Sequence, residues 1–175
     1  RLGAAGCSRI SIHARKAWLQ GLSPKENRDI PPLDYDLVMQ MRGLFPHLHL
    51  SVNGGIGSLE QARGFLDAGL DGVMVGRAAY HQPWDILGEA DALIWGEPQG
   101  PRGCEDVVRD MLPYIERHLT EGGRLHQVTR HMLGLFAGCP GARRWRQVLS
   151  TETTRDGAGP EVVERALSEV AARAA

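Results

Sequence analysis

A regular alternation of short apolar segments with amphipathic segments constrains the fold more than any other feature of this sequence. Strands are predicted at 8–13, 48–52 and 71–76, and helices at 34–45 and 58–68 lie between them. Strands that are joined through helices pair in parallel, because the chain crosses back over the sheet before the next strand begins. The alternation therefore predicts a parallel α/β sheet, and the apolar middle of 71–76 predicts a strand buried on both faces.

Start and stop residues support both of these helices. Asp34 is suited to cap the first helix, and Ser58 with Gln61 three positions later forms a capping-box pattern at the start of the second. Gly69 follows the second helix, where glycine commonly ends a helix in the left-handed conformation. A further helix is predicted at 84–94.

The composition changes at 96–103, where three glycines and two prolines fall within eight residues, as is typical of a linker. Beyond it, helices are predicted at 105–121, 124–137, 141–151 and 160–174. Pro113 predicts a kink in the first of them. We therefore expect an α/β domain over 1–95, a linker over 96–103 and a small all-α helical bundle domain over 104–175.

Composition excludes several classes of protein. With 42% hydrophobic residues, 23% charged residues and a net charge of −1, the chain has the make-up of a globular protein with a core. No apolar run approaches the roughly 20 residues of a membrane span, and we expect no secretion signal.

Cys7, Cys104 and Cys139 are far apart and lack metal-ligand spacing. We therefore expect unpaired thiols, no metal site and a cytoplasmic location.

Polar and glycine residues follow each predicted strand. His13 ends the first strand, Asn53-Gly54-Gly55 follows the second, and Gly76-Arg77 follows the third. The carboxyl ends of parallel strands line the ligand site of α/β proteins, and glycine N–H groups with a guanidinium are suited to hold a phosphate. Two neighbouring glycine-rich strand ends match the phosphate site that (β/α)8 barrels place after strands 7 and 8.

Each of these residues also has a simpler interpretation. A Gly-Gly turn by itself is more often a tight turn than a binding site, and a single histidine is more often a structural residue with a satisfied hydrogen bond. Asn53 could bond a ligand through its amide or stabilise the turn. The phosphate interpretation gains from finding both turns at consecutive strand ends.

Two further segments carry positive charge. Lys16, Lys25 and Arg28 lie on a predicted loop of about 20 residues, and loops of that length in a compact domain are usually functional. Between 124 and 151 there are five arginines, two histidines and no acid. Such a patch is typical of a protein that binds a polyanion, although a solvated helix face has the same charge pattern.

Within this basic patch, Arg143 and Arg146 share one face of a predicted helix, and Trp145 lies between them in sequence. Arginine beside an aromatic residue favours RNA over a small anionic metabolite, because bases stack on such side chains. A tryptophan in a small helical domain is nevertheless more often part of the core.

Four segments carry a resemblance to a known family: HARKAWLQGLSPKENRDIPPLDY (13–35), NGGI (53–56), DGVMVGRAAY (71–80) and TRHMLGLFAGCPGARRWRQVLS (129–150). In this order they closely resemble tRNA-dihydrouridine synthases over roughly residues 8–150. The first segment resembles the A-type branch, which acts on positions 20 and 20a of the tRNA D-loop. The resemblance implies the C-terminal part of an FMN-binding (β/α)8 TIM barrel followed by a helical domain that helps to hold tRNA.

The resemblance also implies roles for individual residues. The positions that match FMN-binding residues of the family are His13, Asn53, Gly54, Gly55, Gly76 and Arg77. The positions that match tRNA-contacting residues of the A-type branch are Lys25, Arg28, Arg143 and Arg146. The implied reaction is reduction of the uracil C5–C6 double bond by reduced FMN, which NADPH regenerates, with a cysteine as general acid and the uridine turned out of its stack.

The sequence departs from the family in one respect. It begins at Arg1 and runs directly into the first of only three predicted strands, so we expect the first half of the barrel, with its catalytic cysteine, to be missing. No cysteine here matches that acid, and no catalytic residue is assigned. Two alternatives remain open: a non-catalytic RNA-binding remnant, and another phosphate-binding barrel enzyme, which leaves 124–151 unexplained. We expect a monomer without a membrane partner.

Overall fold

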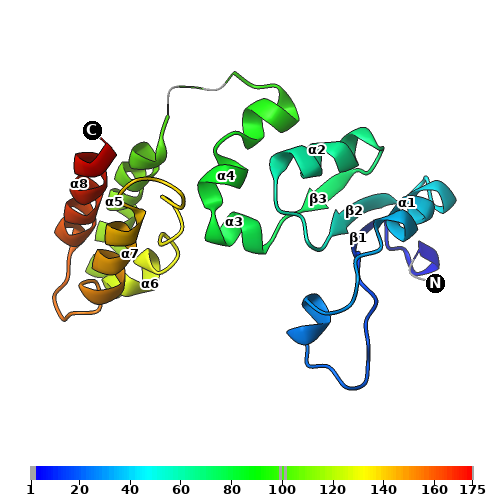
Figure 1. Ribbon diagram of the computed structural model, residues 1–175, viewed down its shortest axis with the longest axis horizontal. Helices are drawn as coiled ribbons and strands as arrows, with labels where there is room; N and C mark the ends of the chain where they lie inside the picture. The colour runs from blue at the N-terminus through cyan, green and yellow to red at the C-terminus, as the bar shows by residue number, and fades with distance from the viewer. Residues whose placement is uncertain (1–2, 99, 101, 175) are drawn as a thin grey trace. The chain divides into compact units, whose positions relative to one another are not determined.

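A computed structural model describes residues 3–98, 100 and 102–174 (Figure 1). Contacts within the chain divide it into two compact units, Arg1–Ala78 and Ala79–Ala175. We call them the sheet unit and the helical unit. This division falls between Ala78 and Ala79, earlier than the predicted linker at 96–103, and the domain assignment made from the sequence stays a prediction.

The sheet unit contains three parallel strands, as the alternating sequence pattern predicts. They are β1 (Arg9–His13), β2 (His49–Asn53) and β3 (Gly72–Met74), in the order β1-β2-β3. The register places Ile12 opposite Val52 and Val52 opposite Val73. Consecutive strands in the chain are thus neighbours in the sheet, which is the arrangement that βαβ connections produce.

The two predicted helices of the sheet unit are α1 (Tyr35–Leu44) and α2 (Leu59–Asp67). The Asp34 carboxylate accepts a hydrogen bond from the Leu37 N–H at 3.0 Å, and the Ser58 hydroxyl accepts one from the Gln61 N–H at 3.2 Å. The Gln61 side chain, however, accepts from the Gly57 N–H and not from Ser58, so the predicted capping box is displaced by one residue. Gly69 follows α2 with a φ of +97°, as its position predicts.

The core of the sheet unit lies on one face of the sheet. Leu50 and Val52 of β2 pack there with Val38 of α1 and Ala62 of α2, and all four are buried. The prediction that the third strand is buried on both faces is wrong for the described residues, because Met74 is 52% exposed. The two helices cover only the face that carries the core, and β3 presents its other face to solvent.

The helical unit begins within α3 (Arg77–His81) and continues through α4 (Pro83–Leu87), the π-helical turn η3 (Asp91–Trp95), α5 (Cys104–Thr120), α6 (Leu125–Thr129), α7 (Ala142–Thr151) and α8 (Pro160–Ala174). The single helix predicted at 84–94 is therefore wrong: α4 ends at Leu87 and Gly88 follows it. Glycine is a poor helix former, so the break falls where propensity is weakest.

The helix predicted at 124–137 is also wrong in its length. After α6 the chain forms successive tight turns in which N–H groups bond three residues back, for example from Met132 to Thr129 and from Leu135 to Met132. These turns direct Met132, Leu135 and Phe136 into the core, where all three are buried. Packing against the other helices thus decides the conformation of this segment over local helical propensity.

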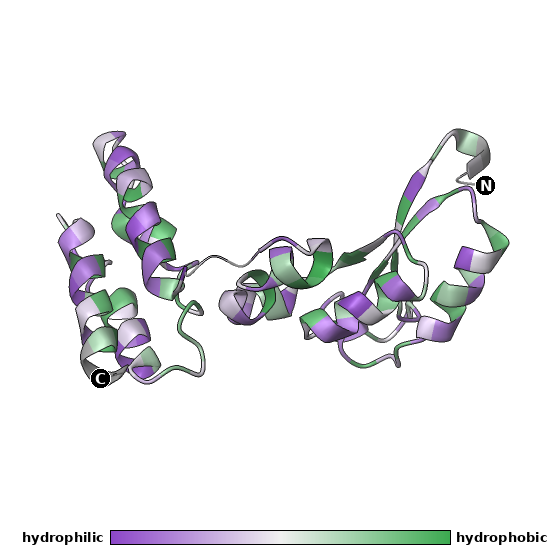
Figure 2. Cartoon of the chain, turned by 90° about the horizontal axis from the view of Figure 1, so that it is seen from above, coloured by the Kyte–Doolittle hydropathy of each residue, from purple (hydrophilic) through white to green (hydrophobic). Residues whose placement is uncertain are grey.

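Trp145 is the centre of the helical core. It is fully buried, its indole N–H donates to the Met132 carbonyl at 3.0 Å, and its ring meets Phe136 edge-to-face with centroids 4.9 Å apart. Val108 and Ile115 of α5 are likewise fully buried in this core. Hydrophobic (green) and hydrophilic (purple) residues alternate along the helices, as is typical of amphipathic helices (Figure 2). None of the described helices is both long enough and apolar enough to span a membrane.

Candidate site at the carboxyl edge of the sheet

The three strands end level with one another. The register pairs His13 of β1 with Asn53 of β2, and Asn53 with Met74 of β3. The residues that follow the strands therefore meet at one edge, which we call the carboxyl-edge site and define as His13, Asn53, Gly54, Gly55, Gly76 and Arg77. The sequence-based expectation that these residues share the carboxyl end of a parallel sheet is met.

Asn53 joins the three strand ends by two hydrogen bonds. Its amide nitrogen donates to the Met74 carbonyl at 2.8 Å, which turns its amide oxygen toward His13 Nδ1 at 2.7 Å. Nδ1 is therefore the donor of that contact, and Nε2 is left to other partners. Asn53 thus ties the end of β2 to the ends of β1 and β3, and it also fixes the orientation of the His13 ring.

The Gly54-Gly55 turn needs glycine at both positions. Both have positive φ, +113° and +67°, which other residues rarely adopt. A Cβ on Gly54 would lie 3.2 Å from the His13 ring, and a Cβ on Gly55 would lie 2.5 Å from Leu33. The Gly54 carbonyl also accepts a hydrogen bond from the Tyr35 hydroxyl at 2.6 Å. The turn is thus held in close contact with the end of the long loop.

Backbone donors remain available at this edge. Among the described residues, the N–H groups of Gly54, Gly55 and Gly76 donate to no protein atom. Uncommitted N–H groups on glycine turns form the kind of concavity that binds anions. The site therefore retains the donors that the phosphate interpretation requires.

Arg77 is hydrogen-bonded to two residues of the long loop. Its guanidinium donates to the Asp29 carboxylate at 2.5 Å and to the Arg28 carbonyl at 3.5 Å. The hydrogen bond from Arg77 lowers the pKa of Asp29 below its ordinary value. Both side chains are largely exposed, so this ion pair is weak and an anion bound at the edge would compete with Asp29 for the guanidinium.

The long loop between β1 and α1 is held by a few specific contacts. Arg15 donates to the Pro31 carbonyl and to the Asp29 carbonyl at 3.3 Å, and it forms an isolated bridge with Leu33. The 3-10 turn η2 (Glu26–Arg28) lies within the loop. This fold brings Arg28 next to Arg77, whereas the sequence treats them only as members of separate segments. Tyr35 and Leu33, which contact the glycine turn, carry no sequence signal that would have identified them.

Of the basic residues on α7, the structure leaves two free of ion pairs. Arg144 bonds to Glu169 at 3.4 Å and to Gln147 at 3.2 Å. Arg143 and Arg146 are exposed and, within the described part of the chain, form no ion pair. The stacking role considered for Trp145 is wrong, because its ring is buried in the core, as the alternative interpretation expects.

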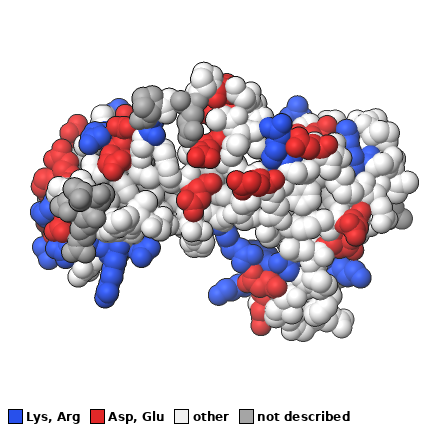
Figure 3. All heavy atoms as spheres, turned by 45° about the horizontal axis from the view of Figure 1, so that its top comes forward, with Lys and Arg blue, Asp and Glu red and all other residues white. Residues whose placement is uncertain are grey.

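The other arginines of the basic segment are committed to contacts within the helical unit. Arg124 pairs with Asp156 at 2.5 Å, and Arg130 donates to the His131 ring at 3.0 Å. Lys and Arg side chains are interspersed with acids over the face seen in Figure 3. The acid-free sequence between 124 and 151 therefore overstates the free positive charge, because Arg124 and Arg144 are ion-paired with acids outside that segment.

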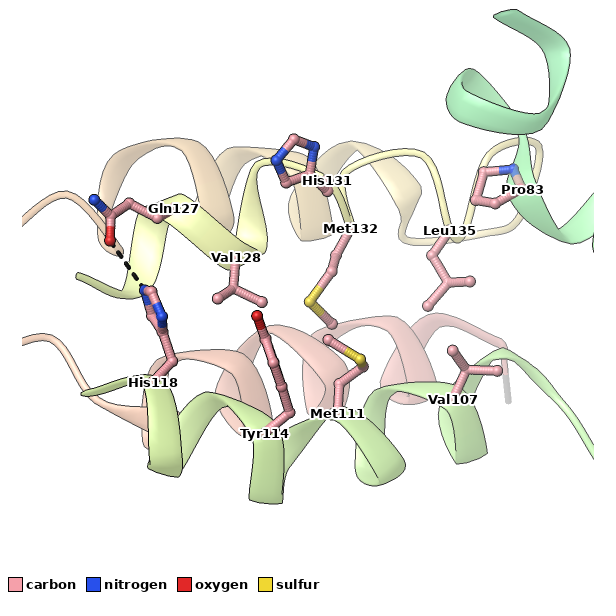
Figure 4. A pocket seen from close by; sticks show the side chains of 10 residues that line it. All are labelled: Pro83, Val107, Met111, Tyr114, His118, Gln127, Val128, His131, Met132 and Leu135. Carbon is pink, nitrogen blue, oxygen red and sulfur yellow. Dashed lines mark hydrogen bonds between the residues drawn. The ribbon is translucent and has the colours of Figure 1, made fainter. Parts of the chain in front are cut away.

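The helical unit also contains an open groove of about 540 Å³ between α5 and residues 127–135 (Figure 4). Most of its lining is apolar, with Met111 and Met132 facing one another across it. Its polar groups are used internally: His118 bonds to Gln127 at 2.9 Å and His131 bonds to Tyr80 at 3.0 Å. The carboxyl-edge site, with its free donors, is the better candidate for ligand chemistry.

The cysteines offer no ligand cluster. Cys104 is buried with its sulfur 3.4 Å from the Leu135 carbonyl, and burial raises its pKa to about 12. Cys139 is exposed, Cys7 is half-buried, and all three are free thiols, as predicted. Within the described residues no group of histidine, cysteine and acidic side chains is placed to hold a metal ion.

Fold and site together define an α/β protein with parallel strands and a candidate ligand site at their carboxyl edge. The chain belongs to the dihydrouridine synthase family, whose model, described as Dihydrouridine synthase (Dus), matches residues 1–171. The family resemblance seen in the sequence motifs is thus confirmed.

Individual relatives agree closely along the chain. The chain is 56% identical over 167 residues to the tRNA-dihydrouridine(20/20a) synthase of Shewanella oneidensis, covering 95% of this chain and 49% of that protein. It is 53% identical over 165 residues to the protein of the same name from Vibrio cholerae (94% and 50%) and 54% identical over 169 residues to that of Escherichia coli K12 (97% and 48%). The chain therefore spans about half the length of the curated relatives it matches.

Proposed function

We propose that this chain takes part in the reduction of uridine to 5,6-dihydrouridine at positions 20 and 20a of the tRNA D-loop, as an oxidoreductase that uses FMN and NADPH. The observation that carries the proposal is the identity of 53–56% over 94–97% of the chain to proteins named tRNA-dihydrouridine(20/20a) synthase. Identity at this level, spread over both compact units, supports a shared substrate as well as a shared fold.

In this proposal, the sheet unit is the C-terminal part of a (β/α)8 barrel. Three strands in sequential parallel order, with helices on one face only, support this assignment. In a barrel the opposite face of each strand points to the interior, which other strands fill with side chains. Ser11 and Met74 lie on that uncovered face, where the Ser11 hydroxyl contacts the Met74 sulfur at 3.9 Å. The helices over 104–175 are then a tRNA-binding bundle that follows a linker at 96–103.

The carboxyl-edge site fits the phosphate end of FMN. The glycine turn leaves no room for a Cβ at Gly55, its N–H groups are uncommitted, and Arg77 adds a positive charge. The residues that would hold the cofactor are His13, Asn53, Gly54, Gly55, Gly76 and Arg77. When bound, reduced FMN supplies the hydride for the C5–C6 double bond of uracil.

The chain's own residues prepare the edge for that ligand. Asn53 fixes His13 so that Nε2 is the ring atom available to a ligand. The Tyr35 hydroxyl and the Leu33 side chain hold the glycine turn in position from the side of the loop. A site whose geometry is set before binding loses less entropy when the ligand is held.

The proposed tRNA contacts are Lys25 and Arg28 on the loop and Arg143 and Arg146 on α7. All four are exposed, and none is engaged in an ion pair among the described residues. Exposed and unpaired cations can neutralise phosphates without first breaking an internal contact.

We further propose that the enzyme is monomeric and acts in the cytoplasm, where tRNA is modified.

Dihydrouridine mapping tests the proposal directly. The complete gene that encodes this sequence is expressed in a strain that lacks its own 20/20a synthase, and positions 20 and 20a of the tRNA are examined by mass spectrometry of nuclease fragments. Dihydrouridine is expected to return at these positions and to stay absent with the empty vector. tRNA that keeps unreduced uridine at both positions, with the protein present in soluble form, would contradict the proposed activity.

A further inference from the structure

The long loop of the sheet unit carries two neighbouring exposed apolar residues, Trp18 and Leu19, which we call the apolar tip. Trp18 is 45% exposed and Leu19 is 92% exposed. The loop projects away from the sheet and its helices (Figure 1). Isolated surface hydrophobics are common, but an exposed indole next to an almost fully exposed leucine on a projecting loop is costly to keep in water without a partner.

The structure holds the Trp18 backbone firmly. The Asn27 amide oxygen accepts a hydrogen bond from the Trp18 N–H at 2.8 Å, and the Asn27 amide nitrogen donates to the Trp18 carbonyl at 2.9 Å. The same amide nitrogen lies 3.4 Å from the Leu22 carbonyl. Asn27 therefore fixes the residue that carries the exposed indole, and binding to that ring requires less ordering of the loop.

The free charge around the tip is positive. Lys16, Lys25 and Arg28 form no ion pair within the described part of the chain. Of the acids in the loop, Asp29 pairs with Arg77 and Asp34 caps α1, whereas Glu26 accepts a hydrogen bond from the Ser23 N–H at 2.8 Å and keeps its negative charge, so the three cations outnumber the unpaired acids. An exposed aromatic ring on a loop that also carries unpaired cations is the combination that binds single-stranded nucleic acid.

We propose that Trp18 is a stacking platform for an unstacked nucleobase of tRNA, with Leu19 extending the apolar contact and the loop cations holding the adjacent phosphates. This inference rests on the proposed function, because it takes tRNA as the substrate. It adds a base-contacting residue to the phosphate contacts of Lys25 and Arg28. The choice of RNA over a protein partner rests on the charge of the loop, since an apolar protein contact has no need of three unpaired cations.

Stacking and phosphate contacts respond differently to salt, and this difference allows a test. Removing a cation that neutralises one phosphate lowers the slope of log K against log salt by about one unit, whereas removing a stacking ring lowers affinity at every salt concentration and leaves the slope unchanged. The purified protein is titrated with an unmodified tRNA transcript at several salt concentrations. The variants are Trp18→Ala, Trp18→Phe and, as a matched control, Trp95→Ala, which removes another exposed indole, this one from the helical unit.

Trp18→Ala is expected to weaken tRNA binding roughly 5- to 100-fold with an unchanged slope, which corresponds to the usual energy of one base-aromatic stack. Trp18→Phe keeps an aromatic face and should retain most of the affinity, and Trp95→Ala should bind like the parent. Because three other tryptophans contribute to the signal, the emission of Trp18 is taken as the difference between the parent and Trp18→Phe. That difference should be quenched when tRNA is added.

The outcomes separate this inference from the proposed function. If Trp18→Ala binds tRNA as tightly as the parent while Lys25→Ala and Arg28→Ala bind less tightly, the platform is overturned and the tRNA function stands. If the parent shows no binding to tRNA, both are overturned. If Trp18→Ala converts an oligomer into a monomer in sedimentation and leaves tRNA affinity unchanged, the tip is a protein contact and the platform is overturned. An unquenched Trp18 difference signal overturns the platform even where Trp18→Ala is unstable.

Discussion

At the scale of single residues, Asn53 and Arg77 organise the carboxyl-edge site in different ways. Asn53 is fully used by protein contacts, which tie His13 to the end of β3. Arg77 belongs to the site and also forms an ion pair with Asp29 of the long loop. Removing Asn53 would thus disturb the arrangement of the edge, whereas removing Arg77 takes away one charge and leaves the strand ends in place. The two residues need different experiments, and Arg77 gives the cleaner one.

Arg77→Ala is expected to weaken FMN binding about ten- to hundredfold, because a charge-assisted contact to phosphate contributes about 1.5–3 kcal/mol. Flavin fluorescence titration of the full-length enzyme measures the effect. Asp29→Asn is the matched comparison: it removes the competing carboxylate and leaves the guanidinium, so FMN affinity should stay the same or increase. Equal affinities for the parent and Arg77→Ala would show that the guanidinium serves only the loop.

At the scale of elements, α7 divides its residues between core and surface. Trp145 faces the core, Arg144 is tied to α8 through Glu169, and Arg143 and Arg146 are exposed to solvent. The sequence predicts the helix and the shared face of the two arginines. Only the packing shows which of the neighbouring residues is free to meet a ligand, because all three arginines look equivalent in a charge count.

The double variant Arg143→Ala with Arg146→Ala is expected to lower tRNA affinity and to reduce its salt slope by up to about 2 units, one for each phosphate that the arginines neutralise. Arg144→Ala serves as the control, since that side chain is already paired and its removal should change the slope little. The measurement is a series of tRNA titrations between low and moderate salt. A slope that is the same in the double variant and the parent would identify the two arginines as surface charges without a phosphate partner.

At the scale of the whole molecule, the described residues form two cores that share no buried residue. One lies under the sheet around Leu50 and Val52, and the other surrounds Trp145. Cys104 belongs to the helical core, where burial keeps its thiol protonated by raising its pKa. Its ionisation is therefore coupled to unfolding of that core.

Alkaline pH is expected to destabilise the helical core through Cys104. The pKa of the thiol is near 9 when unfolding exposes it and about 12 in the folded protein. Between these values unfolding releases a proton, so the free energy of unfolding falls as pH rises above about 9. Urea denaturation followed by circular dichroism at several pH values from neutral to moderately alkaline measures the decline, and Cys104→Ala should show a shallower one. Parallel declines in both proteins would contradict the coupling.

Much of the sheet unit was predictable from local patterns. The strands, the caps at Asp34 and Ser58, and the glycine that ends α2 each depend on residues close in sequence. The break after α4 and the turns after α6 were not predictable in this way. The low helix propensity of Gly88 indicates the break after α4 only weakly. The turns after α6 depend on the burial of Met132 and Phe136 among helices distant in sequence.

The sequence by itself determined the alternation of strands and helices, the meeting of His13, Asn53 and Arg77 at one edge, and the family to which the chain belongs. These follow from periodicity, from the parallel connection rule and from long matching segments. Only the tertiary structure decided what these side chains and backbones contact. Arg77 pairs with Asp29, Trp145 lies in the core, and Asn27 holds the backbone of the exposed Trp18. Each of these depends on which side chains meet across the folded chain, and residue spacing does not specify that.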